Sequence, residues 1–326
     1  MSPSVEDVRT VVQLAGLAPS VHNTQPWHFR WDGRVLELRE DTTRALQVMD
    51  RAGRDRIVSC GAALLTARLG FADAGWSVET ELLPDGEASD LLARILPTAP
   101  SPAAGDVHEL AAAATRRTTD RDPYDPRPVP PEVLSALRAA AEQEGGWLHV
   151  VEPDQEVELD VLLARADETQ RSDPEYLQEL AAWRTESGAT GVPTKALPTV
   201  PAGERGSNLS LRDFEAGSPA GGPARHADMP RPEHPTVLVL GTDGDGRRDW
   251  LVAGQAVARV LLQATVAGVA AQPITSVIEV PMLRGRLRSA LGLVGQPQMV
   301  LRIGYGTHGP VTHRLPVDEV LEITAG

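Results

Sequence analysis

The sequence predicts an α+β fold, because helical and extended patterns follow one another without the regular strand–helix repeat of a parallel sheet. Two stretches that are apolar at most positions, 54–74 and 250–268, predict long buried helices. Shorter runs of alternating or wholly apolar residues predict strands. The 326 residues, 41% of them apolar, suffice for one large domain or two ordinary ones.

The first hundred residues predict a helix, a loop, a hairpin, a second helix and further strands. A helix over 5–18 precedes a loop, and Asp32-Gly33 then turns the chain between extended segments at 27–31 and 35–38. The helix 54–74 ends at Gly75, a usual stop, and strands are expected at 76–83 and 93–96. The stretch 97–106, rich in proline, alanine and serine, predicts a linker.

The remainder of the chain predicts more helices around three strands. Helices are expected at 108–115, 132–143, 157–169, 174–183 and 250–268, strands at 147–151, 235–240 and 298–305, and an extended segment at 316–323. The stretch 184–234 has no sustained periodicity and is dominated by Gly, Pro, Ser and Arg. Such segments are lids, binding loops or disordered chain, and composition favours none of these.

Composition excludes several classes of partner. The formal charge of −14 and the isoelectric point near 5.0 argue against nucleic acid and anionic membranes, which require a basic face. Cys60 is the single cysteine, so an internal disulfide and a cysteine-based zinc site are excluded. No signal-peptide pattern and no apolar stretch of membrane-spanning length is visible, so a cytoplasmic location is expected.

The most informative stretch is the loop Pro19-Ser20-Val21-His22-Asn23-Thr24-Gln25-Pro26-Trp27. The amides of Asn23 and Gln25 each offer two donors and an acceptor, which suits the edge of a heteroaromatic ring. Ser20 and His22, two residues apart in this loop, are not interpreted as a catalytic dyad. His22 is therefore interpreted as a hydrogen-bonding loop residue near a ligand.

A second informative stretch concentrates positive charge in this acidic chain. Arg116, Arg117 and Arg121 flank the hydroxyls of Thr118 and Thr119. Guanidinium forks beside hydroxyl and backbone donors suit a phosphate dianion. A solvated basic patch at a helix end is the alternative for this stretch taken alone.

Two further motifs carry weaker signals. The stretch 241–246 reads G-x-x-G-x-G, which is not the dinucleotide-binding spacing, and its two aspartates would repel a pyrophosphate, so a polar turn is expected. In Gln272-Pro273-Ile274-Thr275-Ser276 the backbone N–H groups of Thr275 and Ser276 could face a ligand, although an ordinary loop explains that motif alone. The eight histidines show no metal-binding spacing.

Together these motifs resemble those of the FMN-binding nitroreductase superfamily, most closely its Acg-type branch, in which two nitroreductase-like halves are fused. The resemblance implies a nitroreductase-like α+β fold with mixed and antiparallel sheets flanked by helices. It implies an N-terminal half at 1–105 with the Pro-Ser-x-x-Asn loop, and a C-terminal half at 106–326 with the phosphate motif and a lid-like insertion at 184–234. The two halves would mimic the usual homodimer. Each motif occurs once, in reversed order, so the resemblance implies one complete FMN site per chain and a second site that lacks both motifs.

The resemblance also assigns cofactor-binding residues. From the two longer motifs these are Pro19, Ser20, Val21, His22, Asn23, Gln25, Arg116, Arg117, Thr118 and Arg121. Near the end of the chain they are Pro273, Ile274, Thr275, Ser276 and Arg314. Thr275 and Ser276 stand where the family has Glu-Gly, and Thr312 stands where it has a lysine. No catalytic side chain and no metal ligand is implied.

The activity implied is that of an FMN-dependent oxidoreductase, with NAD(P)H as transient donor and a nitro, quinone or biosynthetic small molecule as acceptor. The alternative is a non-catalytic protein that sequesters flavin beneath a lid. Because the fused halves already bury the usual dimer interface, a monomer is the simplest expectation, and a homodimer is the alternative.

Overall fold

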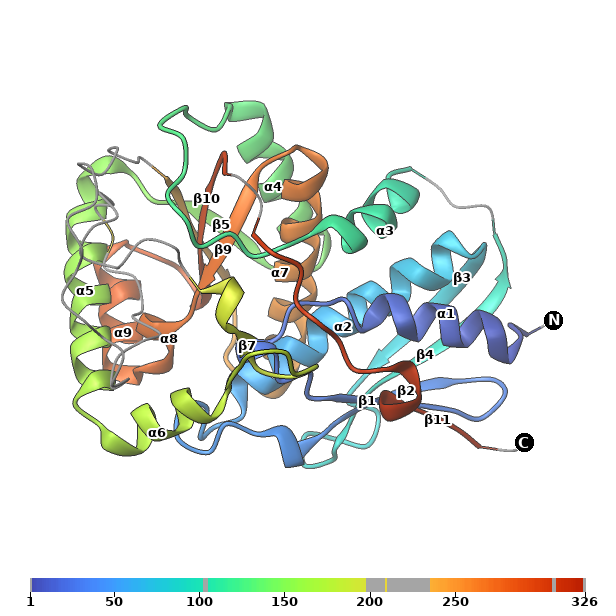
Figure 1. The fold of residues 1–326 in the computed structure, drawn as a ribbon. Coiled ribbons are helices and arrows are strands. Elements are labelled where there is room, and N and C mark those ends of the chain that lie inside the picture. Colours follow the sequence, from blue (N-terminus) through green and yellow to red (C-terminus); the bar gives the residue numbers. More distant parts are fainter. Residues whose placement is uncertain (1, 102–104, 198–208, 210–234, 307–308, 325–326) are drawn as a thin grey trace.

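Two β-sheets on either side of a central helix pair form the framework, which confirms the predicted α+β class. The computed structural model describes residues 2–101, 105–197, 209, 235–306 and 309–324 (Figure 1). The five-stranded sheet has the order β11-β1-β2-β4-β3, and the four-stranded sheet has the order β5-β8-β10-β9. Two short parallel strands, β6 and β7, form a third, separate pair.

The strands of the first sheet come mainly from the first hundred residues. They are β1 (Trp27–Trp31), β2 (Leu36–Glu40), β3 (Trp76–Leu82), β4 (Leu91–Pro100) and β11 (Leu321–Ile323). The predicted hairpin is confirmed, because β1 and β2 pair antiparallel with Trp31 opposite Leu36. The predicted linker begins later than expected, since β4 continues to Pro100 and pairs there with Trp76.

The C-terminal segment departs from its prediction. Instead of one extended stretch, it forms a short helix, α10 (Val317–Val320), and then β11, which pairs in parallel with β1. Pro316 directly precedes this helix, and proline favours the first turn because its fixed φ suits a helix and its missing N–H is not needed there. The end of the chain therefore completes the sheet of the N-terminal region, across the division proposed at 105/106.

The second sheet is antiparallel and covered on both faces. Its strands are β5 (Trp147–Val150), β8 (Thr236–Thr242), β9 (Ala270–Ile274) and β10 (Gln296–Gly304). Leu238, Leu240 and Leu301 pack towards α4 (Pro131–Gln143) and α7 (Arg247–Val266). Alternate residues pack towards α5 (Pro153–Arg171), α8 (Ser276–Glu279) and α9 (Pro281–Ala290). Because successive residues of a strand point to opposite faces, both faces are apolar, as the unbroken apolar pattern predicts.

The central pair consists of α2 (Arg54–Asp73) and α7, which Figure 1 shows between the two sheets. They cross at Gly61 and Gly254. A Cβ atom on Gly254 would lie 2.0 Å from the carbonyl oxygen of Val58, and one on Gly61 would lie 2.3 Å from that of Leu251. Only glycine allows this close approach of two backbones.

The remaining helices cover this framework. They are α1 (Val5–Ala15), α3 (Val107–Arg116) and α6 (Pro174–Ala182), with 3₁₀ turns at Val21–Asn23, Thr42–Arg44 and Thr194–Ala196, and β6 (Arg184–Thr185) and β7 (Val192–Pro193) follow α6. Apart from Leu209, the part of the lid-like insertion at 198–234 lies outside the described residues. None of the helices described here combines the length and apolarity that a membrane crossing requires.

Candidate functional site

A deep cavity lies where the predicted motifs meet. Its empty volume, mouth included, is about 1270 Å³. Four segments line it: the loop after α1, the segment after α3, the start of α8, and the irregular segment 309–316 before α10, called the C-terminal strap below. The apolar side chains of Val58, Ala62, Val257 and Met299 complete the lining. Residues far apart in the sequence thus share one site.

Most of the predicted site residues line this cavity. They are Pro19, Ser20, Val21, His22, Asn23, Arg117, Thr118, Arg121, Pro273, Thr275 and Arg314. Four others lie elsewhere. Arg116 is exposed at the end of α3, Gln25 is buried beneath the loop, and Ile274 and Ser276 are buried on either side of Thr275.

The loop after α1 has a strained backbone that the surrounding structure holds. His22, Asn23 and Gln25 have φ values of 45°, 55° and 50°, a region that non-glycine residues rarely adopt. The hydroxyl of Ser59 in α2 accepts from the backbone N–H of Val21 at 3.1 Å, and that of Ser20 accepts from Gln25 at 3.0 Å. Strain of this kind persists only where the surroundings over-determine it, and it is frequent at ligand sites.

The amides of this loop bind backbone groups of the protein, whereas the sequence suggested the edge of a heteroaromatic ring as their partner. The Asn23 side-chain nitrogen lies 3.2 Å from each of the carbonyl oxygens of Ala189, Gly191 and His313. The Gln25 side chain donates to Ala189 at 2.7 Å and accepts from the N–H of Leu315 at 2.9 Å. These donors therefore fasten the segment 189–191 and the C-terminal strap to the loop.

Two guanidinium groups enter the cavity from different elements. Burial, together with the positive charge of Arg314, lowers the pKa of Arg117 to about 9. Burial lowers the pKa of Arg314 to about 10. Arg314 donates to Asn23 Oδ1 at 3.1 Å, but its Nε is buried and has no partner within the part of the chain that the structure describes. Because the two guanidinium groups repel each other, an anion bound between them would stabilise their charged forms.

The segment that follows Arg117 is anchored to the second sheet. The backbone N–H of Asp120 donates to Ala271 at 3.3 Å, and the Tyr124 hydroxyl donates to the carbonyl oxygen of Asp120 at 2.9 Å. Arg302 of β10, whose side chain is fully buried, donates to the carbonyl oxygen of Asp122 at 2.7 Å and lies 4.0 Å from the Tyr124 ring centre. Sequence reasoning missed Arg302, although a charge in the middle of an apolar strand was a signal that it has a buried partner.

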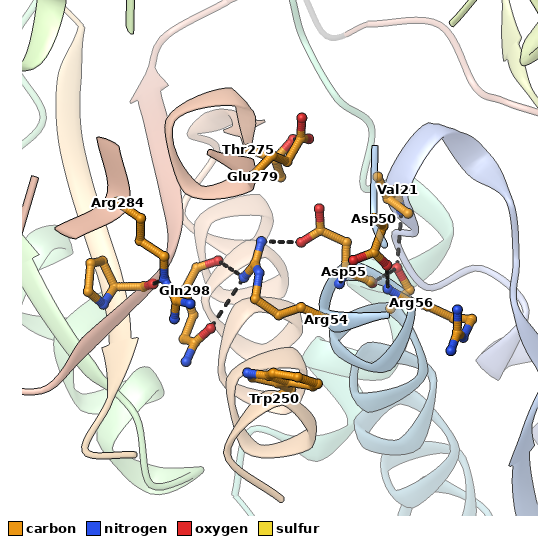
Figure 2. Close-up of polar contacts among 12 residues, drawn as sticks. Val21, Asp50, Arg54, Asp55, Arg56, Trp250, Thr275, Glu279, Arg284 and Gln298 are labelled. Carbon is orange, nitrogen blue, oxygen red and sulfur yellow. Dashed lines mark hydrogen bonds and ion pairs between the residues drawn. The ribbon is translucent and has the colours of Figure 1, made fainter. Parts of the chain in front are cut away.

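The N-terminal end of α2 adds polar residues that sequence reasoning also missed. Asp55 lines the cavity, and its carboxylate accepts from the guanidinium of Arg54. Figure 2 shows that Arg54 reaches from Asp55 to Gln298, whose carbonyl oxygen accepts at 2.7 Å. Asp50 caps the helix by accepting from the backbone N–H groups of Asp55 and Arg56 at 3.1 and 2.8 Å. Burial raises the pKa of Asp50 despite these bonds.

The loop at 143–147, where the C-terminal half would carry its own Pro-Ser-x-x-Asn motif, is filled by an ion-pair network. The Glu144 side chain is 4% exposed and accepts from Arg68 of α2 at 2.6 Å and from Arg259 of α7 at 2.7 Å. Both oxygens of the Glu144 carboxylate are thus occupied by guanidinium groups of the two central helices, so this loop resembles a structural contact rather than a second ligand site.

Two further features of the sequence, the polar turn at 241–246 and the single cysteine, have a defined place in the structure. Asp245, in the turn before α7, pairs with Arg284 at 2.8 Å and accepts from Trp250 at 2.8 Å, as suits a polar turn. Cys60 is buried with its sulfur 3.1 Å from the carbonyl oxygen of Pro26, and burial raises the pKa of its thiol. Among the described residues, no group of three or more His, Cys, Asp or Glu side chains could hold a metal ion.

Comparison with known proteins identifies the family. The Nitroreductase family matches residues 113–305. "Putative NAD(P)H nitroreductase Rv3131" of Mycobacterium tuberculosis is 36% identical over 327 aligned positions, which cover 98% of this chain and 92% of the relative. "Putative NAD(P)H nitroreductase acg" of the same organism is 31% identical over 331 positions, covering 98% and 96%.

A solved structure shows the same fold. The crystal structure described as a "putative nitroreductase" from Anabaena variabilis has a TM-score of 0.55 and 10% sequence identity, over 94% of this chain and 90% of that one. At this identity the likeness concerns the fold alone. With the family match and the two relatives above 30% identity, it follows that the chain belongs to the nitroreductase family.

Proposed function

We propose that this chain binds one FMN in the cavity and uses it as an NAD(P)H-dependent oxidoreductase. The observation that carries the proposal is the meeting of Arg117 and Arg314, two guanidinium groups with lowered pKa values that face one cavity. Family membership and the motif resemblance both support this reading.

The cationic part of the cavity fits a phosphate. None of the described residues accepts a hydrogen bond from the Arg117 side chain, so its five N–H donors are available to a ligand. Thr118 and Thr119 line the same wall and add two hydroxyls. Arg314 already donates through a terminal nitrogen to Asn23 and Thr312. A phosphate dianion would therefore accept mainly from the Arg117 fork and would lower the repulsion between the two guanidinium charges.

The rest of the cavity fits a flat aromatic ring system. Val58 and Ala62 of α2 face it together with Val257 of α7 and Met299 of β10. Binding sites for cofactors are mostly apolar, with a few polar groups that fix the orientation of the ligand. The backbone glycines at the α2–α7 crossing keep this wall in place.

Bound FMN would supply hydride-transfer chemistry between a reduced nicotinamide and a nitro, quinone or biosynthetic acceptor. The contribution of the chain is to bind and orient the cofactor and to exclude water from the buried wall. Hydride transfer to a flavin requires no acid–base side chain of the protein, and we assign none.

One site per chain is part of the proposal. At the loop where a second site would need its motif, Arg68 and Arg259 both pair with the carboxylate of Glu144. The two halves, 1–105 and 106–326, would then contribute the loop and the phosphate contacts of a single site, and a monomer would suffice for flavin binding.

A second candidate function, flavin sequestration, is favoured by one observation. Asn23 and Gln25 hold the segment 189–191 onto the cavity loop, and Val192 of β7 lines the cavity. This segment is therefore fastened beside the site, and if it served as a cover that stays closed, it would retain flavin without admitting a second substrate.

Anaerobic reduction separates the two functions. The protein is saturated with FMN and mixed with NADPH, and absorbance of the flavin near 450 nm is followed. Rapid bleaching is the expected result. Bleaching by dithionite but not by NADPH or NADH would instead support sequestration, and a protein that neither binds FMN nor gains thermal stability from it would contradict both functions.

A further inference from the structure

The hydroxyl of Thr275 belongs to a chain of hydrogen bonds that leads away from the cavity. Thr275 lines the cavity at the start of α8 and donates to Glu279, one turn later, at 2.5 Å. The other carboxylate oxygen of Glu279 accepts from the side-chain nitrogen of Gln170 in α5 at 2.5 Å. The carbonyl oxygen of the Gln170 side chain accepts from the Tyr176 hydroxyl at 3.1 Å.

The polarity of this chain follows from the donors available. With the Tyr176 hydroxyl donating to the Gln170 oxygen, the Gln170 nitrogen faces Glu279, which must accept. The opposite orientation of the Gln170 amide would place its oxygen against a carboxylate oxygen. Glu279 therefore also accepts from Thr275, and the single proton of the Thr275 hydroxyl points away from the cavity. What remains for a ligand is the oxygen, as an acceptor.

Two other polar side chains near this part of the cavity also have no free donor for a ligand. Asp55 also lines the cavity, and its carboxylate, when ionised, has acceptors but no donor. The hydroxyl proton of Ser59 is used for the carbonyl oxygen of Asp55 at 2.7 Å. Figure 2 shows the Thr275–Glu279 pair and Asp55 on separate elements. The cavity therefore combines cationic donors at Arg117 with side-chain acceptors at Thr275 and Asp55.

We propose that Thr275, held by Glu279, accepts a hydrogen bond from an N–H group at the ring edge of the bound flavin. Glu279 is then a positioning residue, because it would act on the flavin through the orientation of the Thr275 hydroxyl. This inference rests on the proposed binding of FMN in the cavity. Oxidised FMN carries one ring N–H, at N3, and two-electron reduction adds another at N5, so the donor has two possible sources that experiment can separate.

The first test compares Thr275→Val with Thr275→Ser. Valine keeps the shape of threonine but removes the hydroxyl, whereas serine keeps the hydroxyl. Affinities of the apoprotein are measured for oxidised FMN, dithionite-reduced FMN and 3-methyl-FMN, in which N3 has no proton. The valine variant should bind at least one of the first two ligands about fivefold more weakly, the effect of one hydrogen bond, and the serine variant should bind within twofold of the wild type.

The pattern of losses identifies the donor. Weaker binding of both redox states of FMN, with 3-methyl-FMN insensitive to the substitution, assigns the contact to N3. Weaker binding of reduced FMN alone, and hence a lower reduction potential of the bound flavin, assigns it to N5. A purely structural defect would weaken 3-methyl-FMN as much as FMN in either redox state, and that result would overturn the proposal.

The second test reverses the Thr275 hydroxyl without removing it. In Glu279→Gln, the side-chain nitrogen of Gln170 still donates, so the oxygen of the new amide must face Gln170. The nitrogen of the new amide then faces Thr275 and donates to its hydroxyl oxygen. The Thr275 proton then turns towards the cavity and opposes the ligand N–H. FMN affinity should fall at least fivefold, with an unchanged melting temperature of the apoprotein within about 2 °C.

The outcomes distinguish this inference from the proposed function. If the wild type does not bind FMN, the proposed function fails. If the wild type binds FMN and both Thr275→Val and Glu279→Gln stay within twofold of it in both redox states, only the role of Thr275 and Glu279 is refuted.

Discussion

Replacing Arg117 with methionine should make the FMN-free protein more stable and the binding of FMN weaker. The Arg117 guanidinium is buried beside the like charge of Arg314, which lowers its pKa to about 9. Methionine occupies a similar volume and removes this repulsion. Apolar replacement of buried charges has stabilised other proteins by about 1–4 kcal/mol. We expect the lower end of this range, about 1 kcal/mol, because part of the Arg117 residue remains exposed to solvent.

The loss of FMN affinity has a different origin. A hydrogen bond to a charged group contributes about 1.5–3 kcal/mol, which corresponds to about a 10- to 150-fold increase in the dissociation constant. Quenching of FMN fluorescence in a titration with apoprotein measures this constant, and thermal unfolding without FMN measures stability. Arg116→Met is the matched control, since this neighbouring arginine is exposed and does not line the cavity. It should change FMN affinity less than twofold.

The reasoning would be refuted by a variant with unchanged FMN affinity and reduced stability without FMN. That result would show that Arg117 is part of a structural network rather than a phosphate ligand. The FMN affinity of Arg117→Lys should lie between those of the wild type and Arg117→Met, because lysine keeps the charge but not the planar fork.

The lowered pKa values determine how the free energy of unfolding and the FMN affinity change with pH. In the free protein, folded Arg117 and Arg314 have pKa values of about 9 and about 10, below the value of 12.5 for an exposed arginine. Above pH 9 the folded state therefore binds fewer protons than the unfolded state, so this contribution to the free energy of unfolding increases with pH. A bound phosphate favours the protonated forms, so FMN affinity should be constant from pH 7 to about 8.5 and fall above pH 9. A titration at fixed ionic strength checks this.

Three further outcomes are expected. Gly254→Ala should abolish soluble folded protein, because its Cβ would lie 2.0 Å from the carbonyl oxygen of Val58. Gly285→Ala, on the exposed side of α9, should instead raise the free energy of unfolding by up to about 1 kcal/mol. Asn23→Ala should lower stability by about 1–3 kcal/mol and increase the rate of proteolysis near residue 190, because the Asn23 amide holds that segment and because the backbone of Asn23, with φ 55°, lies in a region that alanine disfavours. Cys60 should react with a thiol reagent only after unfolding, and rapid labelling of the native protein would contradict its burial.

The elements that sequence predicted well are those whose pattern is local. The helices 250–268 and 54–74 and the strand 235–240 recur in the structure within a few residues at each end. The C-terminal segment was predicted less well, because the single turn of α10 (Val317–Val320) is too short to show a helical period, and the strand β11 after it pairs with β1, nearly the whole chain away. A partner at such separation leaves no periodic signal in either segment.

Within the site, motif positions were predictable and side-chain directions were not. The stretch 116–121 was recognised as the cationic motif, but the sequence does not say which arginine turns inward. Arg116 ends α3 with a helical backbone, whereas Arg117 follows with φ −61° and ψ 124°, which redirects the chain. The change of backbone conformation between neighbours leaves one guanidinium exposed and places the other in the cavity.

The sequence by itself determined the α+β class, the positions of the long helices and the residues able to contact a phosphate, because periodicity, turn residues and charge are properties of short stretches. Only the tertiary structure decided that Arg117 and Arg314 share one cavity, that the Asn23 amide holds the segment 189–191, and that Glu279 directs the Thr275 hydroxyl. Those relations depend on distances and directions between residues that are remote along the chain, and packing of the complete core establishes them.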